Sequence, residues 1–171
     1  MPRDKEKKPL VLEGVRLIFK NFKGKETQYN AEGDRNFGVC IDDDRLVKKL
    51  QREGWNVKFL RAAEEGGEQQ AWLPVTVSFK NRPPQIYIMP EHNMRRRTQL
   101  REDTCDVLDF ADIVGVDLMV SPYQWEVGSA RGTKAYLQSM YVTIEEDPLS
   151  RKYGEMDVDD IPTRSGRTID E

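Results

Sequence analysis

Residues Leu10–Asp42, LVLEGVRLIFKNFKGKETQYNAEGDRNFGVCID, contain the pattern on which the fold prediction rests. Leu10–Phe19 and Asn36–Ile41 are rich in β-branched and aromatic residues, which is typical of strands. The connection between them is polar and contains Gly24 and Gly33, as expected of a surface loop. This stretch therefore predicts two strands joined by a long, basic loop.

Alternation along the two runs predicts which side chains face the core. In the first run one face carries Val11, Val15, Leu17 and Phe19, and in the second run one face carries Phe37, Val39 and Ile41. Gly14 predicts a bulge or bend in the first strand, of the kind that small barrels use to turn corners.

The rest of the chain predicts further strands and two short helices. Asp42–Asp44 can cap a helix that ends at Gly54, and Glu102–Ala111 has a helical pattern. Asn81–Pro84 predicts the turn of a hairpin, and Pro122 predicts a break in a long strand. The further strands are expected at Trp55–Leu60, Ala71–Lys80, Gln85–Met89, Val114–Val127 and Lys134–Ile144. The pattern predicts a mainly β fold with minor α, a small antiparallel barrel of the oligonucleotide-binding (OB) type, with a β-sandwich as the alternative.

Length and composition limit the class of protein. The 171 residues allow one domain, and 33% charged residues against 37% hydrophobic ones indicate that part of the chain lies outside the core. No apolar run is long enough for a membrane-spanning helix, and the N-terminus lacks the apolar segment of a secretory signal. We expect a cytoplasmic protein, in the host cytoplasm if it is phage-encoded. The predicted parts are a disordered leader (1–9), a folded domain (10–147) and an acidic, disordered tail (148–171).

The net charge of −3 combines two unlike parts. The segment 145–171 carries nine acidic and four basic residues, whereas residues 1–144 carry 23 basic and 21 acidic ones. An acidic total is therefore compatible with a body that binds nucleic acid.

Basic and aromatic residues outside the predicted core are the candidate binding residues. Cations neutralise a phosphate backbone and flat rings stack on unpaired bases, so their interleaving suits single-stranded nucleic acid. The basic candidates are Lys20, Lys23, Lys25, Arg35, Lys80, Arg82, Arg95, Arg96, Arg97, Arg131 and Lys134. The aromatic candidates are Phe22, Tyr29, Trp72, Tyr87, Trp125 and Tyr136, with Tyr123 as a further ring outside the core. The alternative interpretation is that half of these rings cover the barrel ends and that the charges only solubilise the surface.

Two groups of candidates are singled out by their arrangement. Trp72, Lys80 and Tyr87 would share the outward face of the predicted hairpin. The adjacent residues Arg95–Arg97 repel one another and would lie more easily beside an anionic partner, although a solvated loop explains them too.

Catalytic signals are weak. Asp103, Asp106, Asp109 and Asp112 recur every three residues and could hold a divalent ion, but a solvated acidic face is the favoured interpretation. The only histidine, His92, and the two cysteines, Cys40 and Cys105, do not form a zinc motif, and we expect both thiols to be reduced and buried. No catalytic residue, metal or cofactor is predicted.

The tail segment Met156–Pro162, MDVDDIP, resembles the acidic tip of bacterial single-stranded-DNA-binding proteins, which recruits partners and competes with DNA. It departs from that tip because no Phe follows Pro162 and nine residues extend beyond it. The resemblance implies a partner-binding segment at Asp157, Asp159, Asp160, Ile161 and Pro162.

The body is similar to the single-stranded-DNA-binding proteins of tailed bacteriophages of actinobacteria and related hosts. The similar segments are LEGVRLIFKNF, QYNAEGDRNFGV, GWNVK, VTVSFKNRPPQI and KAYLQSMYVTIEED. The resemblance implies an OB barrel that binds single-stranded DNA without sequence preference in phage replication or recombination, with replication or recombination proteins as possible tail partners and oligomers compatible with the sequence. The alternative is a phage protein-interaction module that acts on a host nucleic-acid enzyme, as an inhibitor or as a mimic of nucleic acid. A metal-dependent nuclease is a third hypothesis.

Overall fold

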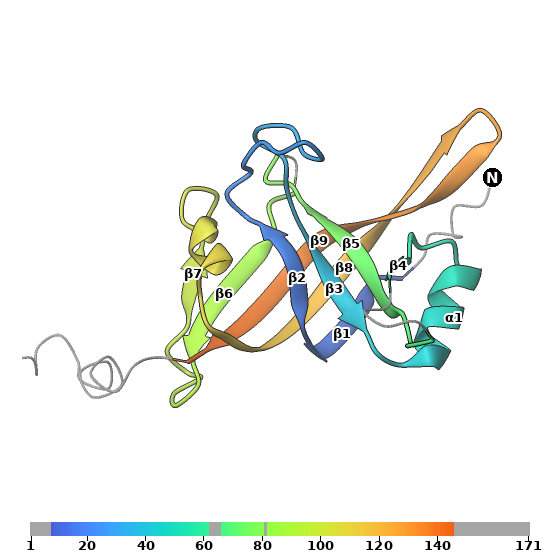
Figure 1. Ribbon diagram of the computed structural model, residues 1–171. Helices are drawn as coiled ribbons and strands as arrows, with labels where there is room; N and C mark the ends of the chain where they lie inside the picture. Colours follow the sequence, from blue (N-terminus) through green and yellow to red (C-terminus); the bar gives the residue numbers. More distant parts are fainter. Residues whose placement is uncertain (1–7, 62–65, 81, 146–171) are drawn as a thin grey trace, which may run out of the picture.

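The computed structural model describes residues 8–61, 66–80 and 82–145, and Figure 1 shows their arrangement. The elements are β1 (Leu10–Val15), β2 (Leu17–Asn21), β3 (Arg35–Ile41), α1 (Asp44–Arg52), β4 (Lys58–Leu60), β5 (Gln70–Val77), β6 (Gln85–Pro90), β7 (Thr98–Leu100), the 3₁₀ helix η2 (Cys105–Asp109), β8 (Ile113–Val127) and β9 (Ala130–Ile144). No helix among these residues is long and apolar enough to cross a membrane.

The described strands form one nine-stranded sheet with the order β1-β8-β9-β5-β3-β2. Its two end strands, β1 and β2, are consecutive in sequence and are separated only by Arg16, whose carbonyl oxygen accepts a hydrogen bond from Cys40 N at 3.0 Å. The sheet therefore curls into a partly open barrel, and the two halves of one bent strand lie at its ends. The mainly β, OB-like prediction is confirmed, and the single sheet does not support the β-sandwich.

The chain from β5 to β6 does not form the predicted hairpin. Both strands pair with β9 in the parallel direction, at Val75↔Ala135 and Ile86↔Met140, and the antiparallel partner of β6 is β7. The connection between β5 and β6 is thus an excursion between two strands that run the same way. The structure describes its residues 78–80 and 82–84, and we call it the excursion 78–84. The hairpin prediction is wrong because turn-forming residues mark a break in a strand without specifying that the chain reverses.

The predicted irregularity at Gly14 is confirmed. Gly14 has φ 61°, and the β1–β8 register shifts between Leu12 and Val15. The bulge changes which residues face inward, so that Leu12 is buried and Val11 is exposed. The prediction that Val11 faces the core is therefore wrong.

A second bulge follows in β2. The register passes from Ile18↔Gly38 to Asn21↔Asn36, which leaves two residues of β2 opposite one residue of β3. Phe19 lies in this bulge with φ 50° and a 58% exposed side chain, so its predicted core position is wrong.

Phe22 takes the core position that follows this bulge. Its side chain is 0% exposed, and its ring stacks on Phe37 with the centroids 5.1 Å apart. The prediction that Phe22 is a surface ring available for stacking on a base is therefore wrong, because the bulge in β2 shifts the alternation by one residue and moves Phe22 to the interior.

The helical predictions are confirmed at α1 and corrected elsewhere. Asp43 caps α1 by accepting a hydrogen bond from Arg45 N at 2.9 Å, and Gly54 follows the helix with φ 85°. The expected helix Glu102–Ala111 is reduced to the short 3₁₀ helix η2, and the expected strand Trp55–Leu60 is reduced to β4.

The hairpin of β8 and β9 is the longest element and projects from the body in Figure 1. Pro122 does not interrupt β8, since it keeps its place in the ladder opposite Ala135. The half of the hairpin near the body contributes to a core that also contains β3, β5 and β6; its fully buried residues include Val39, Leu73, Val75, Ile86, Met140 and Val142.

Candidate nucleic-acid interface

The outer face of β5, β9 and β8 carries side chains that the core does not use. Along β9, Ala135 and Leu137 are buried, so Lys134 and Tyr136 point outward. Tyr136 pairs with Thr76 of β5 on one side and Ser121 of β8 on the other. This register brings three strands together on one exposed surface.

A groove lies between this surface and the excursion 78–84, and we call it the Tyr136 groove. Its volume is about 570 Å³. It is lined by Ser78, Lys80, Arg82, Pro83, Ser121, Pro122, Tyr123, Tyr136, Leu137 and Gln138. The excursion supplies the cations and the β8–β9 hairpin supplies the rings.

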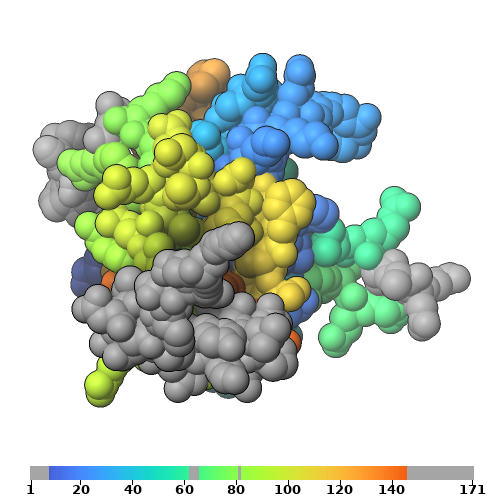
Figure 2. All heavy atoms as spheres, turned by 90° about the vertical axis from the view of Figure 1, so that its left-hand side faces the viewer, coloured from blue at the N-terminus to red at the C-terminus, as the bar shows by residue number. Residues whose placement is uncertain are grey.

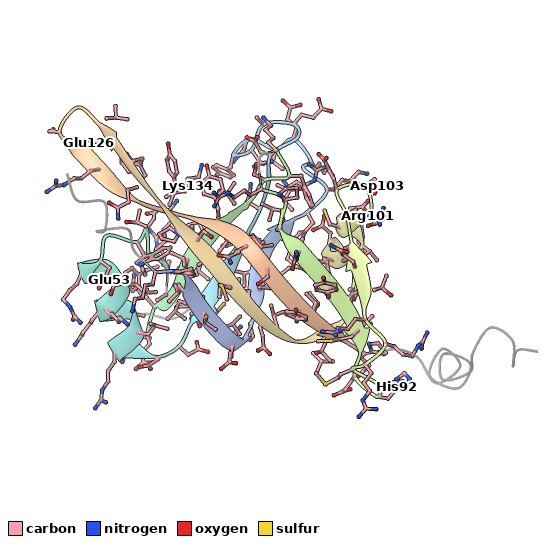
Figure 3. The ribbon with its side chains drawn as sticks, turned by 180° about the vertical axis from the view of Figure 1, so that it is seen from behind. Glu53, His92, Arg101, Asp103, Glu126 and Lys134 are labelled. Carbon is pink, nitrogen blue, oxygen red and sulfur yellow. The ribbon has the colours of Figure 1, made fainter. Side chains whose placement is uncertain are left out.

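The two rings of the Tyr136 groove meet edge to face. The centroids of Tyr123 and Tyr136 are 5.8 Å apart with an interplanar angle of 79°, and Lys134 Nζ lies 5.2 Å from the Tyr136 centroid. Figure 3 shows Lys134 on the hairpin, on the body side of Glu126. Tyr123 is 56% exposed, so part of its ring is accessible for stacking.

The cations of the groove have no carboxylate partner in the described part of the chain. The ion pairs found among residues 8–61, 66–80 and 82–145 are Arg16–Asp42 and Arg35–Glu102. Lys80 and Arg82 are exposed and belong to neither pair. Unpaired cations beside exposed rings match the chemistry of a single strand, a charged backbone with flat bases.

Trp72 lies further along the outer face of β5, in what we call the Trp72 cluster: Phe19, Lys58 and Trp72. Trp72 rests on β3, where a Cβ added to Gly38 would lie 2.5 Å from Trp72 Cε3. Phe19 meets its ring edge to face at 5.0 Å, and Lys58 Nζ lies 5.8 Å from its centroid. A glycine therefore lets the tryptophan lie close against the sheet.

Trp125 and Arg131 lie toward the tip of the β8–β9 hairpin. Trp125 is opposite Gly132, whose added Cβ would lie 3.0 Å from the indole ring, and Arg131 is opposite Glu126. Both predicted residues are exposed, on the same hairpin as the Tyr136 groove.

Tyr87 belongs to a separate group, the Tyr87 stack: Tyr87, Arg97 and Tyr141. The two tyrosine rings stack with centroids 5.1 Å apart, and Arg97 Cζ lies 5.8 Å from each ring. β5 and β6 do not pair with each other, so the prediction that Trp72, Lys80 and Tyr87 are presented by adjacent strands of one hairpin is wrong. Arg95 and Arg96 are exposed in the β6–β7 connection.

The β2–β3 loop divides the remaining basic candidates. Lys23 and Lys25 are exposed, and Tyr29 is 89% exposed. Lys20 Nζ instead donates to Leu108 O at 2.9 Å, and Arg35 is paired with Glu102 at 3.1 Å. The last two cations already have partners within the protein.

The predicted acidic series does not assemble into a metal site. Across residues 8–61, 66–80 and 82–145 no group of three or more His, Cys, Asp or Glu side chains could hold a metal ion. Asp109 has a structural role, since its two carboxylate oxygens accept hydrogen bonds from Phe22 N at 2.8 Å and Lys23 N at 3.1 Å. The tail candidates Asp157, Asp159, Asp160, Ile161 and Pro162 lie outside the described residues.

Sequence reasoning missed several members of these groups. Phe19 was assigned to the core, and neither Lys58 nor Tyr141 was singled out. Tyr123 was noticed as a ring outside the core but not chosen as a contact. Strand alternation could have identified Tyr123 and Tyr141, whereas no local signal predicts that a bulge turns Phe19 outward.

Comparisons with known proteins agree with this architecture. The family described as "Putative phage ssDNA-binding domain" matches residues 2–165, and no curated protein matches the chain. The single-stranded DNA-binding protein from bacteriophage Enc34 with a C-terminal truncation is similar with a TM-score of 0.53 at 13% identity, over 82% of this chain and 87% of that chain. Its complex with ssDNA gives a TM-score of 0.54 at 12% identity, over 82% of this chain and 88% of that chain.

A third structure of the Enc34 protein gives a TM-score of 0.51 at 14% identity, over 89% of this chain and 88% of that chain. At such identities the likeness shows a shared fold. The family match covers nearly the whole chain and confirms the resemblance to phage single-stranded-DNA-binding proteins. This chain belongs to the phage ssDNA-binding domain family.

Proposed function

We propose that the chain binds single-stranded DNA without sequence preference and without catalysis. The observation that carries the proposal is the Tyr136 groove, which is lined by exposed Lys80 and Arg82 together with the rings of Tyr123 and Tyr136. The cations neutralise phosphates and release counterions, while the rings stack on bases of any kind. The family membership and the Enc34 complex with ssDNA support the same function.

The wider interface extends from this groove along the outer surface. Lys134 and Trp125 continue it toward the hairpin tip, and Trp72 continues it across β5. Arg131 lies near the tip on the face of the hairpin that carries Thr133 and Ala135, and in this proposal it is a peripheral contact. The exposed residues Lys23, Lys25 and Tyr29 of the β2–β3 loop, together with Tyr87 and Arg95–Arg97 beside β7, are peripheral contacts in this proposal. The interface leaves out the buried Phe22 and the already engaged Lys20 and Arg35.

A titration of fluorescently labelled oligo-dT at several salt concentrations tests the proposal. We expect affinity to fall steeply with salt, because bound phosphates release counterions, and tryptophan emission to be quenched on binding. Absence of both effects at low salt, with a strand of a few tens of nucleotides, would refute the function.

We further propose a role in phage DNA replication or recombination in the host cytoplasm, with residues 10–147 as the binding domain. The acidic segment 148–171 would compete with DNA for the basic face or recruit replication or recombination proteins through Asp157–Pro162. Truncation after Asp147 should then strengthen binding to oligo-dT. Unchanged or weaker binding would contradict competition and leave the DNA-binding proposal standing.

A further inference from the structure

Phe19 combines two features that ordinary packing disfavours. Among the described residues, Phe19 is the one residue other than glycine that has a positive φ (50°), and its side chain is 58% exposed. An L-residue in this region is strained, and an exposed ring recovers little of that cost through burial. Glycine would satisfy the backbone here with less strain. A strained backbone that carries an exposed ring indicates that the Phe19 ring has a function.

The bulge determines where the ring points. Leu17 pairs with Val39 and packs against the core, so regular alternation would turn Phe19 inward beside Phe37. The extra residue in β2 turns Phe19 to the outer surface and gives the inner position to Phe22. Bulges near functional sites commonly redirect one side chain in this way.

On the outer surface Phe19 stands beside a tryptophan with a cation above it. The rings of Phe19 and Trp72 meet at 64° with centroids 5.0 Å apart, which forms an aromatic corner. Trp72 is supported from below by β3, where Gly38 leaves no room for a Cβ. Lys58 Nζ lies 5.8 Å from the indole centroid on an exposed side chain.

We propose that the Trp72 cluster is a base-binding notch in which one unpaired nucleobase stacks on Phe19 and Trp72 while Lys58 contacts the neighbouring phosphate. This inference rests on the proposed single-stranded DNA function and adds a contact separate from the Tyr136 groove. The ligand is an unpaired base, purine or pyrimidine, since stacking on a ring face does not depend on the donors and acceptors at the base edge. The bound strand would then cross β2, β3 and β5 as well as the β8–β9 hairpin.

The test is the Phe19→Gly variant, measured for affinity to labelled oligo-dT and for its urea unfolding midpoint. Glycine suits the positive φ, so the midpoint should stay unchanged or rise. The affinity should fall by roughly 5- to 150-fold, the effect of losing one stacking ring. Phe19→Leu keeps an apolar side chain without a π-face and should show a similar loss.

Phe110→Ala is the matched control, because Phe110 is an 83% exposed ring at the end of η2 that is a member of neither the Tyr136 groove nor the Trp72 cluster. Its removal should leave the affinity unchanged. Three results would each overturn the notch. They are wild-type affinity of Phe19→Gly for oligo-dT, wild-type affinity of Phe19→Leu, and a loss of affinity in Phe110→Ala equal to that in Phe19→Gly.

The failure of the notch can be told apart from the failure of the function. If Phe19→Gly binds like wild type while Tyr136→Ala binds more weakly, the DNA-binding function stands and the notch falls. If the wild-type protein binds no oligo-dT at low salt, both fall together.

Discussion

The carboxylate of Asp109 accepts a hydrogen bond from Phe22 N at 2.8 Å across 87 residues of sequence. Cys105 Sγ donates to the carbonyl oxygen of the same Phe22 at 3.4 Å, so η2 engages both the backbone N–H and the backbone C=O of Phe22. The start of the β2–β3 loop is therefore anchored to η2, which is distant from it in the sequence. Figure 2 shows the blue residues of this region beside the yellow residues around η2.

We expect Asp109→Asn to lower the free energy of unfolding by about 1–3 kcal/mol, because an amide offers one acceptor oxygen where the carboxylate offers two. One backbone N–H of Phe22 or Lys23 then loses its partner. Urea unfolding followed by circular dichroism measures the change. Asp103→Asn, at an exposed position, is the control and should leave the stability within experimental error.

Gly38→Ala should displace Trp72, because the new Cβ would lie 2.5 Å from Trp72 Cε3. We expect a loss of about 1–3 kcal/mol in stability and a shift in tryptophan emission as the ring moves. Gly115→Ala is the matched control, since no atom lies within 4 Å of its added Cβ. Equal stability of the two variants would show that Trp72 moves aside at little cost.

Lys80→Ala should reduce the slope of log affinity against log salt by roughly one unit, because one phosphate contact is removed. The measurement is the oligo-dT titration at several salt concentrations. Lys48→Ala removes an exposed charge of α1 outside the Tyr136 groove and should leave the slope unchanged. An unchanged slope in Lys80→Ala would exclude this lysine from the interface.

The free energy of unfolding should fall at alkaline pH, because deprotonation of the Cys40 and Cys105 thiols favours the unfolded chain. Burial raises the pKa of the Cys105 thiol above its ordinary value of 9.0, although the Arg35 charge opposes the shift, and burial likewise raises the pKa of Cys40. The unfolded chain releases these protons first, so the stability they contribute is present below pH 9.0 and is lost as the pH rises through the folded-state pKa.

Urea midpoints measured between neutral pH and pH about 10 test this linkage, which amounts to at most about 1.4 kcal/mol per pH unit for each thiol. The Cys40→Ser, Cys105→Ser double variant should lose stability less steeply over the same window. A decline as steep as that of the wild type would assign the effect to other groups.

Local signals in the sequence account for much of the fold. The Asp43 cap and Gly54 bound α1, and the alternation of residues 114–127 and 134–144 predicts the β8–β9 pair, because these signals act between neighbouring residues. The sequence identifies four binding candidates near the Tyr136 groove by their charge or aromatic ring: Lys80, Arg82, Lys134 and Tyr136. It does not predict that they lie close together.

The remaining features depend on contacts that are distant in sequence. Two register shifts reverse the faces of Val11, Phe19 and Phe22, and a shift of one residue changes every side chain that follows. The parallel placement of β6 beside β9 likewise follows from packing of the whole sheet. No local pattern in residues 71–90 specifies it.

The excursion 78–84 is attached at both ends to a single strand, β9, through β5 before it and β6 after it. Its length can therefore change without altering the order or the register of the sheet, while the rings on β9 stay where they are. Evolution can therefore lengthen or shorten the excursion without disturbing the barrel. Insertions or deletions there would change how far its cations reach along a bound strand. Natural relatives are expected to vary in length at this point more than in β5, β6 or β9.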